Sequence, residues 1–196
     1  MSKCHPWFSR PAARPCVPER LENRCLLSGD VTVAYDAATN TVNVVGDNKS
    51  NAIVLSGSLG GGVYTISGAA GTTVNGGSSV TLPVVGSNGS NFNISLGNGD
   101  DVVRAGAVTP AFVPFTLNSL SIETGNGDDT VSLDFSDVLG GLSITTGNGD
   151  DVLTAVREVN VVTGPSFIDA GRGFDVFNGR ANFSVLVGTR RDLGFE

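Results

Sequence analysis

The residues best suited to chemistry in this sequence are aspartates that return in one glycine-rich turn. The turn GNGDD occurs three times, and a later segment, GRGFD, keeps both glycines and the last aspartate. Carboxylate and peptide carbonyl oxygens are the ligands that Ca²⁺ prefers in proteins. The candidate ligands for Ca²⁺ are the acids and glycines of these turns: Asp100, Asp101, Asp128, Asp129, Asp150, Asp151, Asp175, Gly97, Gly99, Gly125, Gly127, Gly147 and Gly149.

If the copies stack in register, their aspartates form a column of like charges. Neighbouring carboxylates roughly 5 Å apart repel by about 3 kcal/mol at an effective dielectric constant near 20. Bound Ca²⁺ would relieve that repulsion, so we expect Ca²⁺ as a cofactor and calcium ions as partners. The alternative is that Asn-Gly-Asp is ordinary turn chemistry, in which solvated aspartates accept backbone N–H groups. The sequence leaves both interpretations open.

The turns belong to a longer internal repeat. Segments 93–103, 121–131, 143–153 and 167–177 align without gaps, and 184–194 aligns as a degraded fifth copy, whose Arg190 and Arg191 could neutralise the end of the acidic column. The first glycines of the copies stand at intervals of 28, 22, 24 and 17 residues. An aliphatic residue stands three positions before each of them: Ile94, Ile122, Ile144, Ile168 and Val185.

This repeat predicts an all-β fold, a parallel β-solenoid with coils of about 17–28 residues. The 27 glycines and the many β-branched residues fit short strands joined by tight turns, and no long segment has a helical period of apolar residues. A β-sandwich is the alternative, but a sandwich has no reason to repeat one turn sequence. We expect a basic tail over 1–29, an irregular β region over 30–92 that caps or extends the solenoid, and solenoid repeats over 93–196.

Two local predictions concern the irregular region. Segments 31–35 and 41–45 flank a turn and read as a β-hairpin. Segment 44–55 resembles a worn copy of the repeat, with Lys49 and Asn51 where the turn acids stand.

The first 30 residues differ from the rest of the chain. Residues 1–24 carry five basic and two acidic groups, which give this part a net charge of +3. The rest of the chain carries –10, and the total is –7. The tail also holds all three cysteines, Cys4, Cys16 and Cys25. No apolar run of a Sec signal follows the basic start, and no 18-residue apolar stretch suggests a transmembrane segment. We expect the tail to be mostly unstructured.

The tail ends in LENRCLLS, residues 21–28. This segment resembles the LEPR-XLL domain found ahead of repetitive surface proteins in some bacteria; Asn23 stands where that pattern has proline, and Leu21, Glu22, Arg24, Leu26 and Leu27 match. The resemblance implies an exported protein, extracellular or on the cell surface, with a sorting element at its N-terminus.

The repeated turn carries a second resemblance. GNGDD followed by an apolar residue resembles the inner part of the hemolysin-type (RTX-like) calcium-binding repeat, G-G-x-G-x-D-x-U-x. The residue before each first glycine is not glycine, and the copies recur every 17–28 residues instead of every nine. The resemblance implies Asp101, Asp129, Asp151 and Asp175 as carboxylate ligands.

Composition also narrows the function. An acidic body with a single lysine argues against nucleic-acid binding, which needs a continuous basic face. The only histidine is His5, so a Ser/His/Asp set is absent, and Arg104, Arg157, Asp134 and Asp137 are the only candidates for catalysis outside the repeats. We therefore expect a structural or binding module and no enzyme. Its partners would be cell-surface or matrix components, with an adhesin-like solenoid without metal as one alternative and a polysaccharide-active enzyme as the less favoured one.

Overall fold

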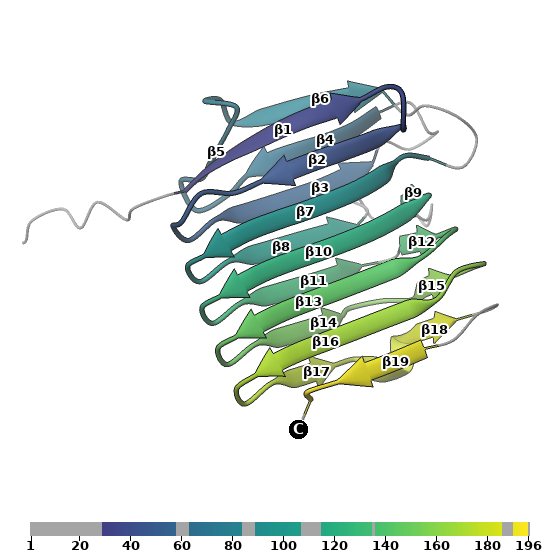
Figure 1. Cartoon of the computed structure of the whole chain (residues 1–196). Helices are drawn as coiled ribbons and strands as arrows, with labels where there is room; N and C mark the ends of the chain where they lie inside the picture. The colour runs from purple at the N-terminus through teal and green to yellow at the C-terminus, as the bar shows by residue number, and fades with distance from the viewer. Residues whose placement is uncertain are drawn as a thin grey trace, which may run out of the picture.

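The computed structural model describes residues 29–57, 63–83, 89–106, 115–134, 136–185 and 190–195. The tail with its LEPR-XLL-like segment and its cysteines lies outside the described residues. The described chain is a stack of strands that run in three sheets (Figure 1). Its only helical element is a short 3₁₀ turn, η1 (Arg180–Asn182). Among the described residues, no helix is long and apolar enough to cross a membrane.

The first sheet has eight strands, in the spatial order β19 (Arg190–Leu193), β16 (Ser166–Arg172), β13 (Leu142–Asn148), β10 (Ser119–Asn126), β7 (Asn91–Asn98), β2 (Thr41–Val45), β1 (Asp30–Asp36) and β5 (Thr73–Val74). The second has seven, in the order β17 (Val176–Asn178), β14 (Val152–Ala155), β11 (Thr130–Asp134), β8 (Val102–Gly106), β3 (Ala52–Gly57), β4 (Val63–Gly68) and β6 (Ser79–Pro83). The third has four: β18 (Phe183–Val185), β15 (Val159–Val161), β12 (Ser136–Val138) and β9 (Phe115–Leu117).

From β7 onward each coil contributes one strand to each sheet, and each strand pairs in parallel with its equivalent in the next coil. The repeat isoleucines Ile94, Ile122, Ile144 and Ile168 lie in one column of the first sheet. The chain is therefore a parallel β-solenoid, as the repeat predicted. A β-sandwich is wrong, because all copies place the same strand in the same sheet.

The solenoid interior is filled by the alternate side chains of all three sheets. The isoleucine column contributes from the first sheet, Val103, Val131 and Leu153 from the second, and Val138 and Val161 from the third, all essentially inaccessible to solvent. No coil could bury these side chains alone, so stacking supplies the core.

The region before β7 extends two of the sheets and then changes direction. The predicted hairpin is confirmed, since β1 pairs with β2 in antiparallel register. β2 and β3 pair in parallel with β7 and β8, so they form part of a coil. β4 and β6 continue the second sheet in antiparallel fashion.

The worn copy over 44–55 lies in register with the repeat. Asn51 takes the place of Asp101, because the strand residues that follow the two, Ala52 and Val102, are paired. Ser50 takes the place of Asp100, and Lys49 stands against Gly99. The prediction was right for Asn51 and one position off for the outer acid.

The predicted fifth copy over 184–194 is wrong. Val185 pairs with Val161 in the third sheet, and Asp192 is the residue in register with Ile168. The interval of 17 residues was too short, because a coil needs a third-sheet strand before it returns to the first sheet. Arg190 and Arg191 therefore stand opposite Ser166 and Phe167 within the sheet, away from the turn.

Candidate cation site at the glycine turns

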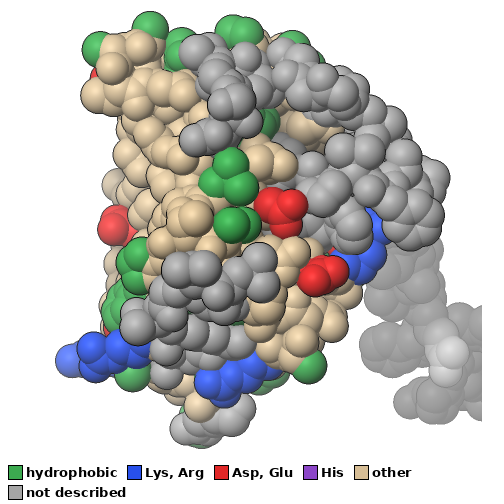
Figure 2. All heavy atoms as spheres, turned by 90° about the vertical axis from the view of Figure 1, so that its right-hand side faces the viewer, with side chains coloured by type: hydrophobic (Ala, Val, Ile, Leu, Met, Phe, Trp, Pro, Cys, Tyr) green, Lys and Arg blue, Asp and Glu red, His purple; other side chains and the backbone are tan. Residues whose placement is uncertain are grey.

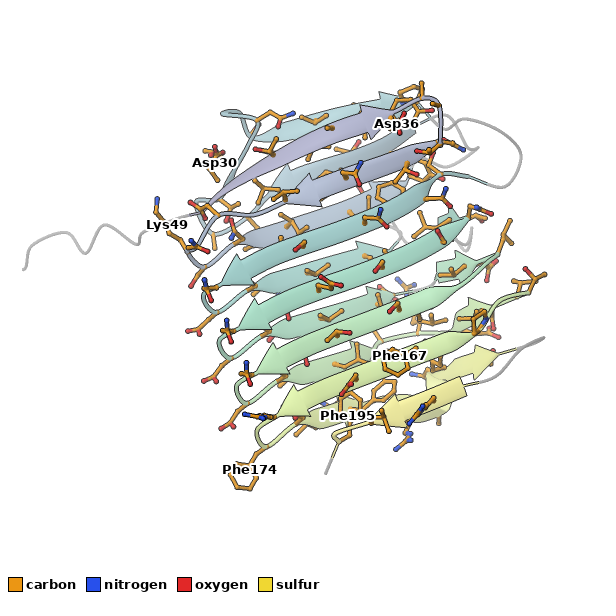
Figure 3. The ribbon with its side chains drawn as sticks, viewed as in Figure 1. Asp30, Asp36, Lys49, Phe167, Phe174 and Phe195 are labelled. Carbon is orange, nitrogen blue, oxygen red and sulfur yellow. The ribbon has the colours of Figure 1, made fainter. Side chains whose placement is uncertain are left out.

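The repeated turns connect the first sheet to the second and lie above one another along one corner of the stack (Figure 3). The first glycines, Gly97, Gly125 and Gly147, have φ angles of +104°, +111° and +111°, a conformation open mainly to glycine. They also lie back to back: a Cβ on Gly125 would stand 1.9 Å from the carbonyl oxygen of Gly97.

The second glycines of the turns, Gly99, Gly127 and Gly149, have φ angles of +118°, +131° and +137°. A Cβ on Gly127 would stand 2.2 Å from the carbonyl oxygen of Gly99. The turn carbonyls proposed as neutral ligands thus lie against the backbone of the next coil.

The turn acids separate into two columns instead of one. The first acid of each pair, Asp100, Asp128 or Asp150, is exposed, and we call these three the outer column. The second acid is buried with at most 1% of its surface accessible. We call these four the inner column: Asp101, Asp129, Asp151 and Asp175.

Each inner carboxylate accepts a backbone N–H from the preceding coil. The N–H of Asn51 donates to Oδ1 of Asp101 at 2.7 Å, and the N–H of Asp101 donates to Oδ1 of Asp129 at 2.8 Å. Asp129 and Asp151 donate in the same way to Asp151 and Asp175, both at 2.9 Å. The inner column therefore links every neighbouring pair of coils through a buried side chain.

The outer column does the reverse, because its carboxylates accept from the following coil. The N–H of Asp128 donates to Oδ1 of Asp100 at 3.0 Å, and that of Asp150 to Oδ1 of Asp128 at 2.9 Å. Phe174 ends this column: its N–H donates to Asp150 at 3.0 Å, and its exposed ring projects outward at the C-terminal end of the stack (Figure 3).

A third column consists of the turn asparagines, which sequence reasoning did not single out. The side-chain amide of Asn98 donates to Oδ1 of Asn48 at 2.9 Å, Asn126 to Asn98 at 2.6 Å, and Asn148 to Asn126 at 2.7 Å. The sequence contains a pattern that predicts this column, because asparagine stands between the two glycines in all three GNGDD turns. Arg172 ends this column in register with Asn148.

Burial governs the electrostatics of the inner column. Burial is the main reason why the pKa of Asp101 is raised to about 7 and that of Asp129 to about 6. The neighbouring inner carboxylates also act to raise both pKa values, and the backbone N–H donors act to lower them. Burial raises the pKa of Asp151 as well. Buried carboxylates resist ionisation because they lose their hydration.

The inner column also has unused acceptor atoms. The second carboxylate oxygen, Oδ2, of each inner aspartate is buried and has no hydrogen-bond partner. These oxygens are of the type that Ca²⁺ prefers, so the donor chemistry fits that ion. The described residues nevertheless contain no cluster of three or more histidine, cysteine or acidic side chains arranged around one point. A cation here would have to draw ligands from successive coils and from the backbone.

Among the acids and bases outside the repeats, Arg104 and Asp134 line one hollow on the second sheet. Arg157 donates to both oxygens of Asp134, at 2.6 and 2.8 Å. Asp137 accepts from the amide of Asn160 at 3.1 Å. Arg104 is exposed on the outer face of β8.

The fold and the turns define the class of the protein as a parallel β-solenoid with stacked aspartate–glycine corners. Comparisons with protein-family models, with curated proteins and with solved structures found no match to this chain. The assignment to the class of parallel β-solenoids therefore rests on the strand pairing and turn geometry of the described residues.

Proposed function

We propose that this protein is an exported or cell-surface structural and binding module without catalytic activity. The observation that carries this proposal is the use of the turn acids: both carboxylate columns accept backbone N–H groups of neighbouring coils. Acids that hold a scaffold together are not free for proton transfer or nucleophilic attack. The resemblance of residues 21–28 to LEPR-XLL supports export.

Location in the source cell tests this proposal. An antibody against the chain should detect it in the medium or the envelope fraction, and protease added to intact cells should degrade it. A cytosolic protein serves as the control for lysis. Detection in the cytosol alone, protected from protease, would overturn the proposed function.

Calcium stabilisation is a second candidate, favoured by the unpartnered Oδ2 atoms of the inner column. A ligand that binds only the folded state stabilises it by RT ln(1 + [L]/Kd), about 2.7 kcal/mol at 100 times Kd. Millimolar Ca²⁺ should then raise the melting temperature and chelator should lower it. Mg²⁺ should act less, because it demands tighter octahedral geometry.

Two triple variants locate the effect. Asp101→Asn, Asp129→Asn and Asp151→Asn together remove the inner ligands and should abolish the response to Ca²⁺. The outer set, Asp100→Asn, Asp128→Asn and Asp150→Asn, makes the same change of charge at exposed positions and should keep it. A melting temperature indifferent to Ca²⁺, with no binding heat in calorimetry, would show that the aspartates only form turns.

A further inference from the structure

The second sheet has a hollow on its outer face, away from the glycine turns. Its volume is about 360 Å³, which falls within the range of roughly 300–1,000 Å³ of small-molecule sites. Among the described residues, its lining includes six from β3, β8, β11 and the position after β14: Val54, Arg104, Gly106, Ser132, Asp134 and Val156.

Strand register explains why the hollow forms at this place. Val54, Arg104 and Ser132 stand side by side in one row across β3, β8 and β11. In the row two residues further along, Gly106 stands beside Asp134. A Cβ on Gly106 would lie 2.1 Å from the carbonyl oxygen of Asp134, so close stacking favours glycine and the row has no side chain at this position.

The charge of the hollow is opposite to that of the whole chain. The acid at its edge, Asp134, is neutralised by the two hydrogen bonds from Arg157. Arg104 is exposed, and within the described ranges it forms no ion pair. The described lining of the hollow therefore carries one uncompensated positive charge on a chain of net charge –7. A guanidinium binds carboxylate and sulfate groups through paired hydrogen bonds.

The other described residues of the lining are apolar or weakly polar. Val156 is 52% exposed, one of the few large hydrophobic side chains so exposed among the described residues, and Val54 stands across the hollow from it. The hydroxyl of Ser132 offers one donor and one acceptor. We infer that the hollow binds a small ligand that carries one carboxylate or sulfate group on a ring-sized skeleton, with Arg104 pairing the anion and Val156 contacting the ring.

Binding to the full-length chain tests this inference. The probes are glucuronate and glucose 6-sulfate, with glucose and inorganic sulfate as controls for the ring alone and the anion alone. Calorimetry or NMR titration should show both sugar acids binding with millimolar affinity and at least tenfold tighter than either control. The two sugar acids distinguish a carboxylate from a sulfate ligand.

Variants assign the binding to the hollow. Arg104→Gln should weaken it at least tenfold without a change in melting temperature, and Ser132→Leu should weaken it by filling the space. Arg172→Gln removes an exposed arginine at the C-terminal end and should leave binding unchanged. Equal binding of inorganic sulfate, no binding of either sugar acid, or binding unaffected by Arg104→Gln overturns the inference. None of these outcomes bears on the cellular location that tests the proposed function.

Discussion

At the scale of single residues, the inner aspartates combine two opposing effects. Their Oδ1 atoms hold the backbone of the preceding coil, yet burial makes the negative charges of Asp101, Asp129 and Asp151 unfavourable. Asn51 shows that a neutral side chain fits the same column, since it stands in register with Asp101 and is 1% exposed. Its amide donates to the carbonyl oxygens of Asp47 and Lys49. The column therefore accommodates an uncharged side chain at this end.

The raised pKa values predict that stability falls as pH rises through the weakly acidic range. The ordinary pKa of aspartate is 3.8, whereas burial raises the pKa of Asp101 to about 7 and of Asp129 to about 6. Between these limits the folded chain holds protons that the unfolded chain has released, so the free energy of unfolding decreases with pH. The contribution is complete below about pH 4 and lost above about pH 7, and denaturant unfolding across this range in chelator measures it.

Asp129→Asn tests the origin of this pH dependence. The amide keeps an oxygen for the N–H of Asp101, and its nitrogen can donate to the nearby Thr124 hydroxyl, whose own proton goes to the carbonyl of Thr146. The pKa of Asp129 is raised by about two units, and each unit corresponds to about 1.36 kcal/mol. We therefore expect Asp129→Asn to raise the free energy of unfolding by about 2–3 kcal/mol at pH 8 and to make its dependence on pH flatter.

Asp128→Asn is the matched control, because it removes the same charge from the exposed outer column. It should change stability by less than about 0.5 kcal/mol. A loss of stability in Asp129→Asn at every pH would show that the buried charge itself is required.

At the scale of the element, the glycine turn is fixed by backbone conformation and by contact between coils together. Gly147 has a φ angle of +111°, and a Cβ there would lie 2.0 Å from the carbonyl oxygen of Gly125. The added Cβ and the carbonyl oxygen could move apart only if the two coils separated, because both atoms are attached to the backbone of paired strands. The turn sequence is thus a consequence of stacking.

Gly147→Ala should therefore destabilise the chain by about 3 kcal/mol or more, as backbone strain and steric overlap add. Gly76→Ala separates the two effects, since Gly76 also has a positive φ angle, +73°, but a Cβ there would have no other atom within 4 Å. It should cost about 1 kcal/mol, from conformation alone. Denaturant unfolding of both variants gives the comparison, and equal costs would refute a role for contact between coils.

At the scale of the whole molecule, the two ends of the stack differ. Near the N-terminal end the edge of β1 is covered by a side chain, because the amide of Asn75 bonds both the N–H and the carbonyl of Val33. At the C-terminal end an aromatic cluster forms, with Phe177 packed against Phe183 and Phe195. Basic side chains also gather toward this end (Figure 2). Covered edges limit unwanted strand pairing.

The sequence by itself determined the fold class and the order of the repeats. Gap-free copies with glycine and isoleucine at constant positions leave few arrangements other than stacked coils, and the columns of Gly97 and Ile94 formed as predicted. The hairpin before them was also visible, because its turn and alternating strands are local features. Such patterns are visible in the sequence because equivalent side chains have the same environment in every coil.

Only the tertiary structure decided how the turn acids divide. Adjacent aspartates such as Asp100 and Asp101 look equivalent in sequence, but the turn directs one outward and buries the other against the next coil. The end of the repeat was likewise beyond the sequence, because the path of the chain through the third sheet places Asp192, and not Val185, beside Ile168. Contacts between coils fix both outcomes, and those contacts join residues more than 20 positions apart.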